Sequence, residues 1–325
     1  AGICEGEAKY MSGSTAIIGS GLIGRAWAIA FARAGWSVRL WDPAAQAAAE
    51  AQGLVAALLE DLAANDMLRG QEVEEVLGRI STAPTLSQAL DGVDWVQENA
   101  PEKLEVKRAL WQEMEPLAPA EAVLASSTSA IVPSLFSEEL ASRARCLTVH
   151  PINPPYLVPA VELVPAPWTS SETLKRAEEV MRAIGQAPIV MRKEIDGFVM
   201  NRLQGALLEE AFRLVADGIC SAEDVDIGIR DGLALRWSFM GPFETIDLNA
   251  PAGGRDYAER YQGLYENLFA SMQRRVDWTG PVMEEIETER RQRLPAEQLG
   301  DRQRWRDRRL MARLRHRSQA AEGVG

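Results

Sequence analysis

Residues 15–43 read TAIIGSGLIGRAWAIAFARAGWSVRLWDP, and their pattern sets the architecture expected for the chain. A short apolar run, Ala16–Ile18, predicts a strand that ends at a glycine. Residues 26–34 have helical character, and Gly35 follows them as a stop. Val38–Trp41 then predicts a second strand. Strand, glycine loop, helix and strand in this order indicate the opening of a parallel βαβ unit.

The glycine loop between the first strand and the helix has the spacing GxGxxG. Glycines there allow a tight turn and a close approach to a pyrophosphate, and the helix N-terminus supplies N–H groups. Asp42 ends the second strand, where a carboxylate binds ribose hydroxyls and repels a 2′-phosphate. NAD is therefore favoured over NADP, although a glycine-rich turn alone is weak evidence. The candidate cofactor residues are Gly19, Ser20, Gly21, Leu22, Ile23, Gly24 and Asp42.

Strands and helices continue to alternate as far as residue 193, which indicates a doubly wound α/β sheet. Residues 194–325 show helical patterns without a convincing strand. We therefore expect a Rossmann-type domain at 12–193 and an all-helical substrate and dimerisation domain at 194–325. The further strands are expected in VDWVQE (93–98), AVLASSTS (122–129), CLTVHP (146–151) and AVELVP (160–165).

Three segments in the second half of the chain have features of helices. Serines and a threonine begin the helical pattern at 169–185, and glycine ends it. SAEDVDIGIRDG (221–232) has a Ser-x-x-Asp cap and a glycine stop. The Arg-rich end, 301–317, carries Trp305, Leu310, Met311 and Leu314 among its charges. RNA binding is one reading of these arginines, but a solvated, partner-facing helix fits the accompanying acidic residues better.

Composition narrows the class of protein. The chain has 325 residues, 46% of them hydrophobic, and a formal net charge of −12. This charge disfavours nucleic acid and anionic membranes as partners. The first residues lack the apolar core of a signal peptide, and no apolar run reaches the roughly 18 residues of a membrane span. We expect a cytoplasmic protein whose residues 1–11 are a non-native leader or a disordered start. Three cysteines and two histidines without ligand spacing predict no metal site.

His150 is the most conspicuous titratable residue of the sequence. It ends a predicted strand, and ligands of open α/β sheets bind beyond the carboxyl ends of strands. Glu162 lies in an otherwise apolar run and is able to orient the ring and favour its charged form. A core histidine bonded to a carbonyl is an equally good reading of these two residues alone. A neighbouring nicotinamide favours function, because oxidation of an alcohol needs a base.

Four other polar residues are candidates with weaker individual signals. Ser129 follows the AVLA strand and is suited to donate to a substrate oxygen, but loop serines are common. Asn201 lies early in an apolar helical stretch and needs partners if it is buried. Glu102 and Lys107 flank the start of a charged helix, where the nicotinamide half of the cofactor is expected; an ordinary charged helix start is the simpler reading.

Several longer motifs together resemble the 3-hydroxyacyl-CoA dehydrogenase family, most of all its lambda-crystallin and L-gulonate 3-dehydrogenase branch. The resemblance runs from about Thr15 to the Arg-rich end. It is carried by the glycine-loop segment and by ENAPEKLEVK (98–107), SSTSAIVPS (126–134), HPINPPYLVPAVELVP (150–165), GFVMNRLQGALLEEAFRLV (197–215) and GLALRWSFMGPFETIDLN (232–249).

The resemblance implies a role for each matching residue. Ser129 and His150 fall on the family's catalytic serine and histidine, Glu162 on its paired glutamate and Asn201 on its helical asparagine. Glu102 and Lys107 fall on cofactor contacts, beside the glycine loop and Asp42. Ser127 stands where the wider family has asparagine, although this branch carries serine. The resemblance also implies an NAD-dependent oxidoreductase that forms a homodimer through its helical domain.

The substrate is the least determined part of the prediction. Relatives usually pass almost directly from the glycine of GLA into MGPFE, but LALRWSF intervenes here and brings Arg236. A guanidinium suits a free carboxylate, which favours a small L-3-hydroxy acid such as L-gulonate. Ser129, Asn153, Asn201 and Arg236 are the expected substrate contacts. An ordinary surface arginine, a CoA thioester substrate, a carnitine-type substrate and a non-enzymatic crystallin-like scaffold are the alternatives.

Overall fold

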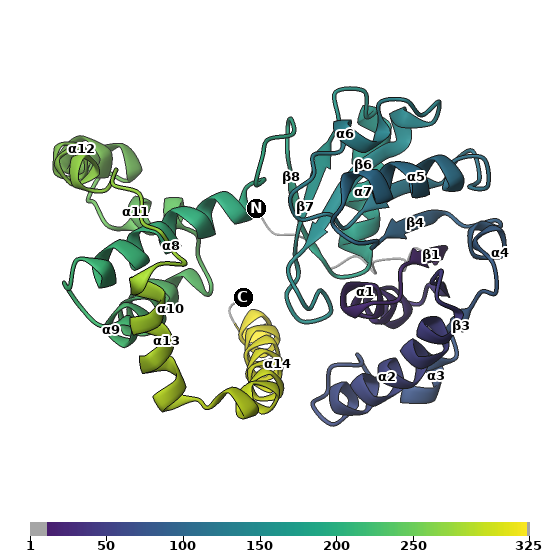
Figure 1. Ribbon diagram of the computed structural model, residues 1–325, viewed down its shortest axis with the longest axis horizontal. Coiled ribbons are helices and arrows are strands. Elements are labelled where there is room, and N and C mark those ends of the chain that lie inside the picture. The colour runs from purple at the N-terminus through teal and green to yellow at the C-terminus, as the bar shows by residue number, and fades with distance from the viewer. Residues whose placement is uncertain (1–11, 324–325) are drawn as a thin grey trace. The chain divides into compact units, whose positions relative to one another are not determined.

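A computed structural model describes residues 12–323, and the prediction for residues 1–11 lies outside them. Its centre is an eight-stranded sheet, counted within these residues, in the order β3-β2-β1-β4-β5-β6-β7-β8 (Figure 1). Neighbouring strands from β3 to β6 are parallel, β7 is antiparallel to β6, and β8 is parallel to β7. The predicted doubly wound α/β fold with a helical C-terminal part is confirmed.

The strands match the predicted segments closely and add two short ones. β3 and β8 were not predicted, because only one residue of β3 and none of β8 is buried, which leaves no pattern of buried positions to detect. Pro188 within β8 is typical of an edge strand. The strands are β1 (Ser14–Ile18), β2 (Ser37–Trp41), β3 (Ile80–Thr82), β4 (Trp95–Glu98), β5 (Val123–Ser126), β6 (Cys146–Pro151), β7 (Ala160–Pro165) and β8 (Ala187–Val190).

Helices cover both faces of the sheet and bury two separate cores. One core holds Trp27, Phe31 and Trp95, whose rings pack in tilted pairs. The other core contains Trp111 and Phe136, with ring centroids 4.7 Å apart. The first face carries α1 (Leu22–Arg33), α2 (Ala45–Ala63), α3 (Val73–Leu77) and α7 (Ser171–Ala183); the second carries α4 (Leu86–Leu90), α5 (Leu104–Met114) and α6 (Ser134–Ser137), with η1 (Arg143–Arg145) before β6.

Helices alone make up the following part of the chain. The predicted Ser221 cap is present as a full capping box with Asp224. The predicted glycine stop at Gly232 is wrong, since the helical path continues through Gly228 and Gly232 as a π-helix and then through Ala234–Trp237. The elements are α8 (Met200–Ala216), α9 (Ala222–Ile227), η2 (Gly228–Leu233), α10 (Ala234–Trp237), α11 (Pro242–Leu248), α12 (Gly254–Ser271), α13 (Pro281–Arg293), η3 (Ala296–Gln298) and α14 (Leu299–Gly323).

Contacts divide the chain into two units. The helical unit comprises 200–302, and of the described residues 303–323 belong with 12–199 in the nucleotide-binding unit. This division differs from the sequence-based one, which assigned the whole of 194–325 to the helical part. The reason lies on α14: Met311 is only 2% exposed and joins the core of α1 and α2, while Arg308 and Arg315 pair with Asp61 and Asp66.

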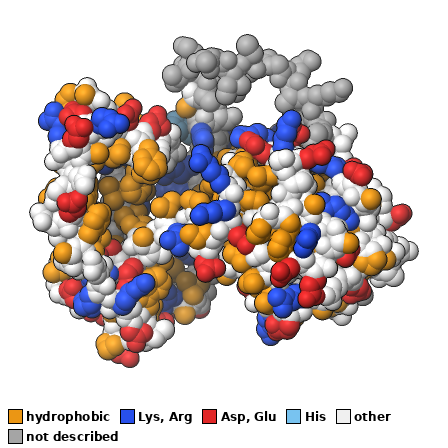
Figure 2. All heavy atoms as spheres, turned by 90° about the horizontal axis from the view of Figure 1, so that it is seen from above, with side chains coloured by type: hydrophobic (Ala, Val, Ile, Leu, Met, Phe, Trp, Pro, Cys, Tyr) orange, Lys and Arg blue, Asp and Glu red, His pale blue; other side chains and the backbone are white. Residues whose placement is uncertain are grey.

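Side chains of α8 fix the segment that follows α12. Glu209 accepts hydrogen bonds from the Val276 amide (3.0 Å) and Trp278 Nε1 (2.8 Å). Arg213 donates to the Arg274 carbonyl at 2.8 and 2.9 Å. Hydrophobic side chains nevertheless gather on the surface of this unit, at the left of Figure 2. The most exposed are Phe243, Phe239, Ile219, Leu248 and Leu203.

None of the helices within residues 12–323 has the length and apolarity needed to cross a membrane.

Candidate active site

The glycine loop has the geometry that a pyrophosphate site requires. Gly19 has φ +93°, and a Cβ there would lie 2.9 Å from the Asn99 carbonyl oxygen. A Cβ on Gly24 would lie 1.9 Å from the carbonyl oxygen of Gly19. At Gly21 nothing lies within 4 Å of such a Cβ, and no side chain caps the first turn of α1. The loop therefore leaves its middle glycine open to a ligand at the helix N-terminus, which fits a dinucleotide.

Asp42 lies beside this loop at the end of β2. Its Oδ2 accepts hydrogen bonds from the amide and hydroxyl of Ser20, both at 2.9 Å, and its Oδ1 accepts from the Ala44 amide at 3.0 Å. These contacts fix a carboxylate next to the phosphate-binding turn. The arrangement is the one that binds adenosine ribose hydroxyls and disfavours a 2′-phosphate.

His150 and Glu162 face each other across the antiparallel β6–β7 pair. They are directly paired in the register, and His150 Nδ1 lies 2.6 Å from Glu162 Oε2. The hydrogen bond expected from the sequence is thus present. Glu162 is fully buried, and its Oε1 accepts the Val199 amide at 2.6 Å. With Nδ1 engaged, Nε2 is the ring nitrogen that is able to exchange a proton.

Phe198 forms an apolar wall beside this pair. Its ring centroid lies 5.5 Å from that of His150, and the side chain is fully buried. The His150 side chain itself is 9% exposed. A mostly buried ring that is fixed on one side by a carboxylate has few orientations available, as a general base requires.

Ser129 lies on the exposed loop after β5, and Glu102 holds that loop. Glu102 Oε1 accepts the amides of Ser129 (3.1 Å) and Ala130 (2.9 Å) and the Thr128 hydroxyl. Burial acts to raise the pKa of Glu102, but the Thr128 and Ala130 hydrogen bonds and the charge of Lys107 outweigh it and lower the pKa. Glu102 therefore organises a loop in addition to its expected contact with cofactor.

Lys107 is paired with a residue that the sequence did not single out. Its Nζ lies 2.9 and 3.2 Å from the two oxygens of Glu98, and both side chains are at most 1% exposed. Glu98 is the last residue of β4 and carries no recognisable signal, since a charged residue at the end of a strand usually faces water. A lysine on the following helix was the only available hint.

Ser127 is the centre of a separate hydrogen-bond network behind the loop. Its hydroxyl oxygen accepts hydrogen bonds from Trp27 Nε1 (2.9 Å) and Gln97 Nε2 (2.7 Å), and the hydroxyl donates to Asn99 Oδ1 (2.7 Å). Gln97 in turn accepts from Trp95 Nε1. A small hydroxyl fits among these groups, which accounts physically for serine at this position.

The remaining predicted residues belong to different parts of the structure. Asn153 is exposed on the loop after β6. Asn201 lies in the first turn of α8 and lines a hollow of about 620 Å³ with Gly205 and Phe269. Arg236 is exposed on α10, where its charge acts on Tyr257 of α12. The last two residues thus lie in the helical unit, and the others in the nucleotide-binding unit.

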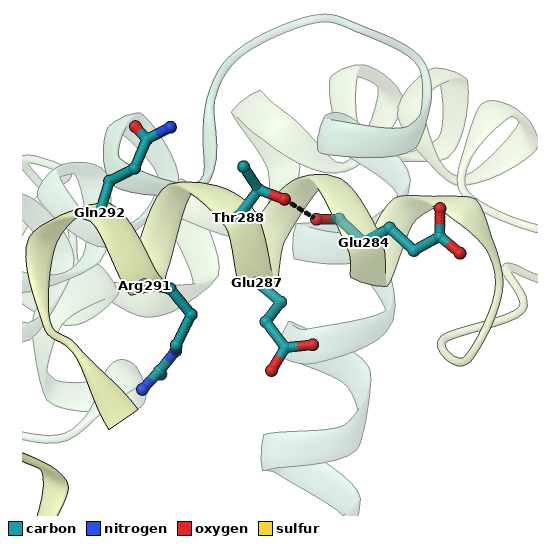
Figure 3. Close-up of a pocket in the computed structure, with 5 residues that line it drawn as sticks. All are labelled: Glu284, Glu287, Thr288, Arg291 and Gln292. Carbon is teal, nitrogen blue, oxygen red and sulfur yellow. Dashed lines mark hydrogen bonds between the residues drawn. The ribbon is translucent and has the colours of Figure 1, made fainter. Parts of the chain in front are cut away.

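A further hollow, of about 640 Å³, lies along α13, but its side chains are not arranged to bind a ligand. Glu287 and Arg291 point to the opposite side of the helix from Gln292 (Figure 3). Thr288 donates back to the carbonyl of Glu284 at 2.7 Å, within the helix. Side chains that diverge from a single helix do not converge on a ligand, so this surface is not a candidate active site.

Fold, glycine loop and His150–Glu162 pair together define the class as a dinucleotide-dependent dehydrogenase. Comparison with known proteins gives the family. The family model of the 3-hydroxyacyl-CoA dehydrogenase NAD binding domain matches residues 14–195, and that of the family's C-terminal domain matches 197–291. The chain belongs to the 3-hydroxyacyl-CoA dehydrogenase family, whose members are NAD-dependent dehydrogenases that act on CH–OH groups.

Individual relatives cover most of the chain. Lambda-crystallin of Oryctolagus cuniculus is 39% identical over 96% of this chain and 99% of its own length. The L-carnitine dehydrogenase of Streptomyces griseus subsp. griseus is 38% identical over 74% of this chain and 70% of its own length. A solved structure of 5-formyl-3-hydroxy-2-methylpyridine 4-carboxylic acid 5-dehydrogenase, an NAD⁺-dependent dismutase, has a TM-score of 0.79 at 27% identity and covers 93% of this chain and 97% of its own.

Proposed function

We propose that the protein oxidises the 3-hydroxyl group of a small L-3-hydroxy acid with a free carboxylate, similar to L-gulonate, to the 3-keto acid, or catalyses the reverse reduction. The buried His150–Glu162 pair is the observation that carries the chemistry of this proposal. The lambda-crystallin relative, similar over nearly its whole length, supports the substrate branch.

His150 acts in this proposal as the base that removes the hydroxyl proton through Nε2. Glu162 holds Nδ1 and stabilises the positive charge that the imidazole takes on with the proton. Ser129 donates a hydrogen bond to the substrate oxygen, and Asn201 orients the substrate. When bound, NAD⁺ accepts the hydride; the glycine loop and Asp42 hold its adenosine and phosphates. In the reverse direction His150 returns the proton to the 3-keto oxygen.

A substrate panel tests the proposal directly. NADH formation is followed with L-gulonate, L-3-hydroxybutyrate, L-carnitine and 3-hydroxybutyryl-CoA at matched concentrations. The highest kcat/KM is expected for L-gulonate or another free acid without a positive charge. A clear preference for the thioester would reject the free-acid substrate, and no turnover of any compound would favour a crystallin-like scaffold.

Arg236 is the proposed partner of the substrate carboxylate. Truncating one member of a desolvated ion pair costs a few kcal/mol, so Arg236→Met should lower kcat/KM for the acid by about 10²-fold. The methyl ester of the same acid should lose far less, and affinity for NADH should be unchanged. An equal loss for acid and ester would make Arg236 structural and return the CoA thioester as a serious candidate.

A carnitine-type acid is the second candidate, and the Streptomyces griseus relative favours it. Such a substrate carries a trimethylammonium group, which is usually recognised by aromatic faces. Tyr257 and Tyr261 on α12 have ring centroids 4.7 Å apart and offer such faces. Faster turnover of L-carnitine than of L-gulonate, lost on Tyr261→Leu, would select this candidate.

Cofactor choice and assembly complete the proposal. Asp42 should give NAD at least a tenfold advantage over NADP in kcat/KM, because its charge would face the 2′-phosphate of NADP. Asp42→Ser should narrow this advantage.

We further propose a cytoplasmic homodimer that forms through the helical unit. The exposed side chains of this unit include Phe243, which is 83% exposed, and Leu264, which is 55% exposed. Light scattering on the purified protein should give twice the mass of one chain, and Phe243→Glu should lower it.

A further inference from the structure

Three consecutive residues, Thr128, Ser129 and Ala130, form the turn that presents the proposed catalytic serine. Their backbone amides are all bound by side chains rather than by neighbouring backbone. The Thr128 amide donates to Ser126 Oγ at 3.2 Å, and the other two amides donate to Glu102 Oε1 at 3.1 and 2.9 Å. The position of Ser129 thus depends on two side chains outside the turn.

Both of these side chains lead back to one residue, Glu98. Ser126 Oγ donates to Glu98 Oε2. On the other route, Lys107 Nζ bridges the carboxylates: it contacts Glu98 Oε1 at 2.9 Å and Glu102 Oε2 at 3.7 Å. The two oxygens of Glu102 therefore face different partners, with one toward the lysine and the other toward the turn.

Glu98 is itself fixed in place by its surroundings. It is fully buried at the end of β4, between β1 and β5. Besides the contacts above, its carboxylate accepts the Ala100 amide at 2.6 Å and Trp111 Nε1 at 3.2 Å. Every acceptor direction of the carboxylate is used, so the group has no room to reorient.

We propose that Glu98 is a positioning residue, which sets the backbone of the 128–130 turn through Ser126 and through Lys107–Glu102. Glu102 would thereby hold the serine turn in addition to its expected contact with NAD, whereas Lys107, which is buried and uses its donors within the protein, would act through Glu102. This inference deepens the proposed function and rests on it only for the role of Ser129; the placement of the turn does not depend on any substrate.

Amide hydrogen–deuterium exchange of the full chain, resolved to residues 127–131, tests the proposal without any activity. In Glu98→Gln the new side-chain NH₂ group faces groups that are themselves hydrogen-bond donors, and the negative charge that holds Lys107 is lost. The backbone amides of Ser129 and Ala130 should therefore exchange about tenfold faster or more. Lys107→Met should release the same two amides, whereas Ser126→Ala should release mainly that of Thr128.

A matched control lies at the other end of the same strand. Asp94 precedes β4 and accepts hydrogen bonds from the Ser14 amide (2.9 Å) and hydroxyl (3.1 Å). Asp94→Asn also removes a carboxylate from a strand end, but should leave exchange at 128–130 unchanged. Exchange that rises equally in the Glu98 and Asp94 variants, or does not rise in the Glu98 variant, would overturn the proposal.

Activity supplies the second readout. Glu98→Gln should lower kcat/KM by about 10- to 100-fold, the scale of a misplaced catalytic group. In a Ser129→Ala background the same change should cost less than about threefold, because the positioned group is already absent. Full additivity would mean that Glu98 does not act through Ser129. If Ser129→Ala alone is harmless, the proposed function fails, and the exchange data still decide the role of Glu98.

Discussion

Two buried carboxylates, Glu98 and Glu162, lie toward the end of the sheet at which the parallel strands β4 and β6 finish. Each of them is paired with a basic side chain. Glu162 contacts His150 through one hydrogen bond of 2.6 Å, and the imidazole keeps a second nitrogen for other chemistry. Glu98 contacts Lys107 through both oxygens, and the lysine also donates to the Ala100 carbonyl at 3.3 Å and lies 3.7 Å from Glu102. The two pairs therefore have similar charges and similar burial, but they make different contacts.

The difference is in how many hydrogen-bonding groups remain for a ligand. An ammonium has three donors, and Lys107 uses them on the two oxygens of Glu98 and on the Ala100 carbonyl. An imidazole whose Nδ1 is held by a carboxylate keeps Nε2 for proton exchange. The Glu98–Lys107 pair, which has no hydrogen-bonding group left over, is suited to holding the structure. The Glu162–His150 pair, which keeps Nε2, is suited to catalysis. The following predictions test this distinction, from the largest expected effect to the smallest.

Replacing the histidine should abolish most activity and leave the fold intact. His150→Asn is expected to lower kcat by about 10²- to 10⁴-fold, the usual contribution of a positioned general base. Steady-state NADH formation measures this loss. Affinity for NADH should stay close to wild type, because the glycine loop is untouched, and this retained binding would show that the variant is folded. Near-normal turnover would remove His150 from the mechanism.

Replacing the lysine should have its main effect on stability. Lys107→Met leaves Glu98 charged and buried without a counter-ion, which costs about 3–5 kcal/mol of unfolding free energy. Urea denaturation measures this change. The double variant Glu98→Leu, Lys107→Met should recover much of the loss, because a matched apolar pair has no unpaired charge. A single variant as stable as wild type would show that the pair is not a structural device.

Glu162→Gln should be milder than loss of the histidine. The amide oxygen is still able to accept the Val199 N–H group, but the ring loses the carboxylate that orients it. The fall in kcat should be smaller than the roughly 10²- to 10⁴-fold loss expected for removal of the base itself, because His150 remains in place. The measurement is kcat beside that of His150→Asn. A larger loss than in the histidine variant would assign the proton transfer to Glu162.

The smallest effect is expected at acid pH from Glu102. Its pKa in the folded protein is lowered from 4.5, so its stabilising contribution is present above this pH and is lost as the pH falls through the lower, folded value. Glu102→Gln should therefore flatten the fall in melting temperature below about pH 4.5. The effect should be slight, because the carboxylate is 39% exposed. An unchanged pH profile would contradict the proposed linkage.

Much of the nucleotide-binding unit was predictable because its signals are local. The glycine loop needs its residue types within six positions, and β6 and β7 are largely apolar runs in which His150 and Glu162 stand out. The hydrogen bond between these two residues could be predicted because they lie on two strands that follow each other in the sequence. β3 was missed because only Ile80 of its three residues is buried, which leaves no alternating pattern to detect.

Glu98 and the path of α14 could not be predicted because they depend on distant partners. Glu98 is buried only because Lys107, Trp111 and Ser126 converge on it from α5 and β5. Met311 lies with Leu310 and Leu314 in a strongly charged helix, and a short apolar stripe of this kind is compatible with any partner. Which core it enters depends on α2, about 250 residues earlier in the chain.

That return of α14 also bears on the order of events during synthesis. Met311 is 2% exposed within the core built by α1 and α2, and Leu310 and Leu314 pack against the same core. Residues 310–314 therefore complete a unit that contains α1 and α2, with the helical unit inserted between them in the sequence. On the ribosome this core stays open until residue 314 has been made, so a nascent chain exposes an apolar surface that is suited to a chaperone while the whole helical unit is synthesised.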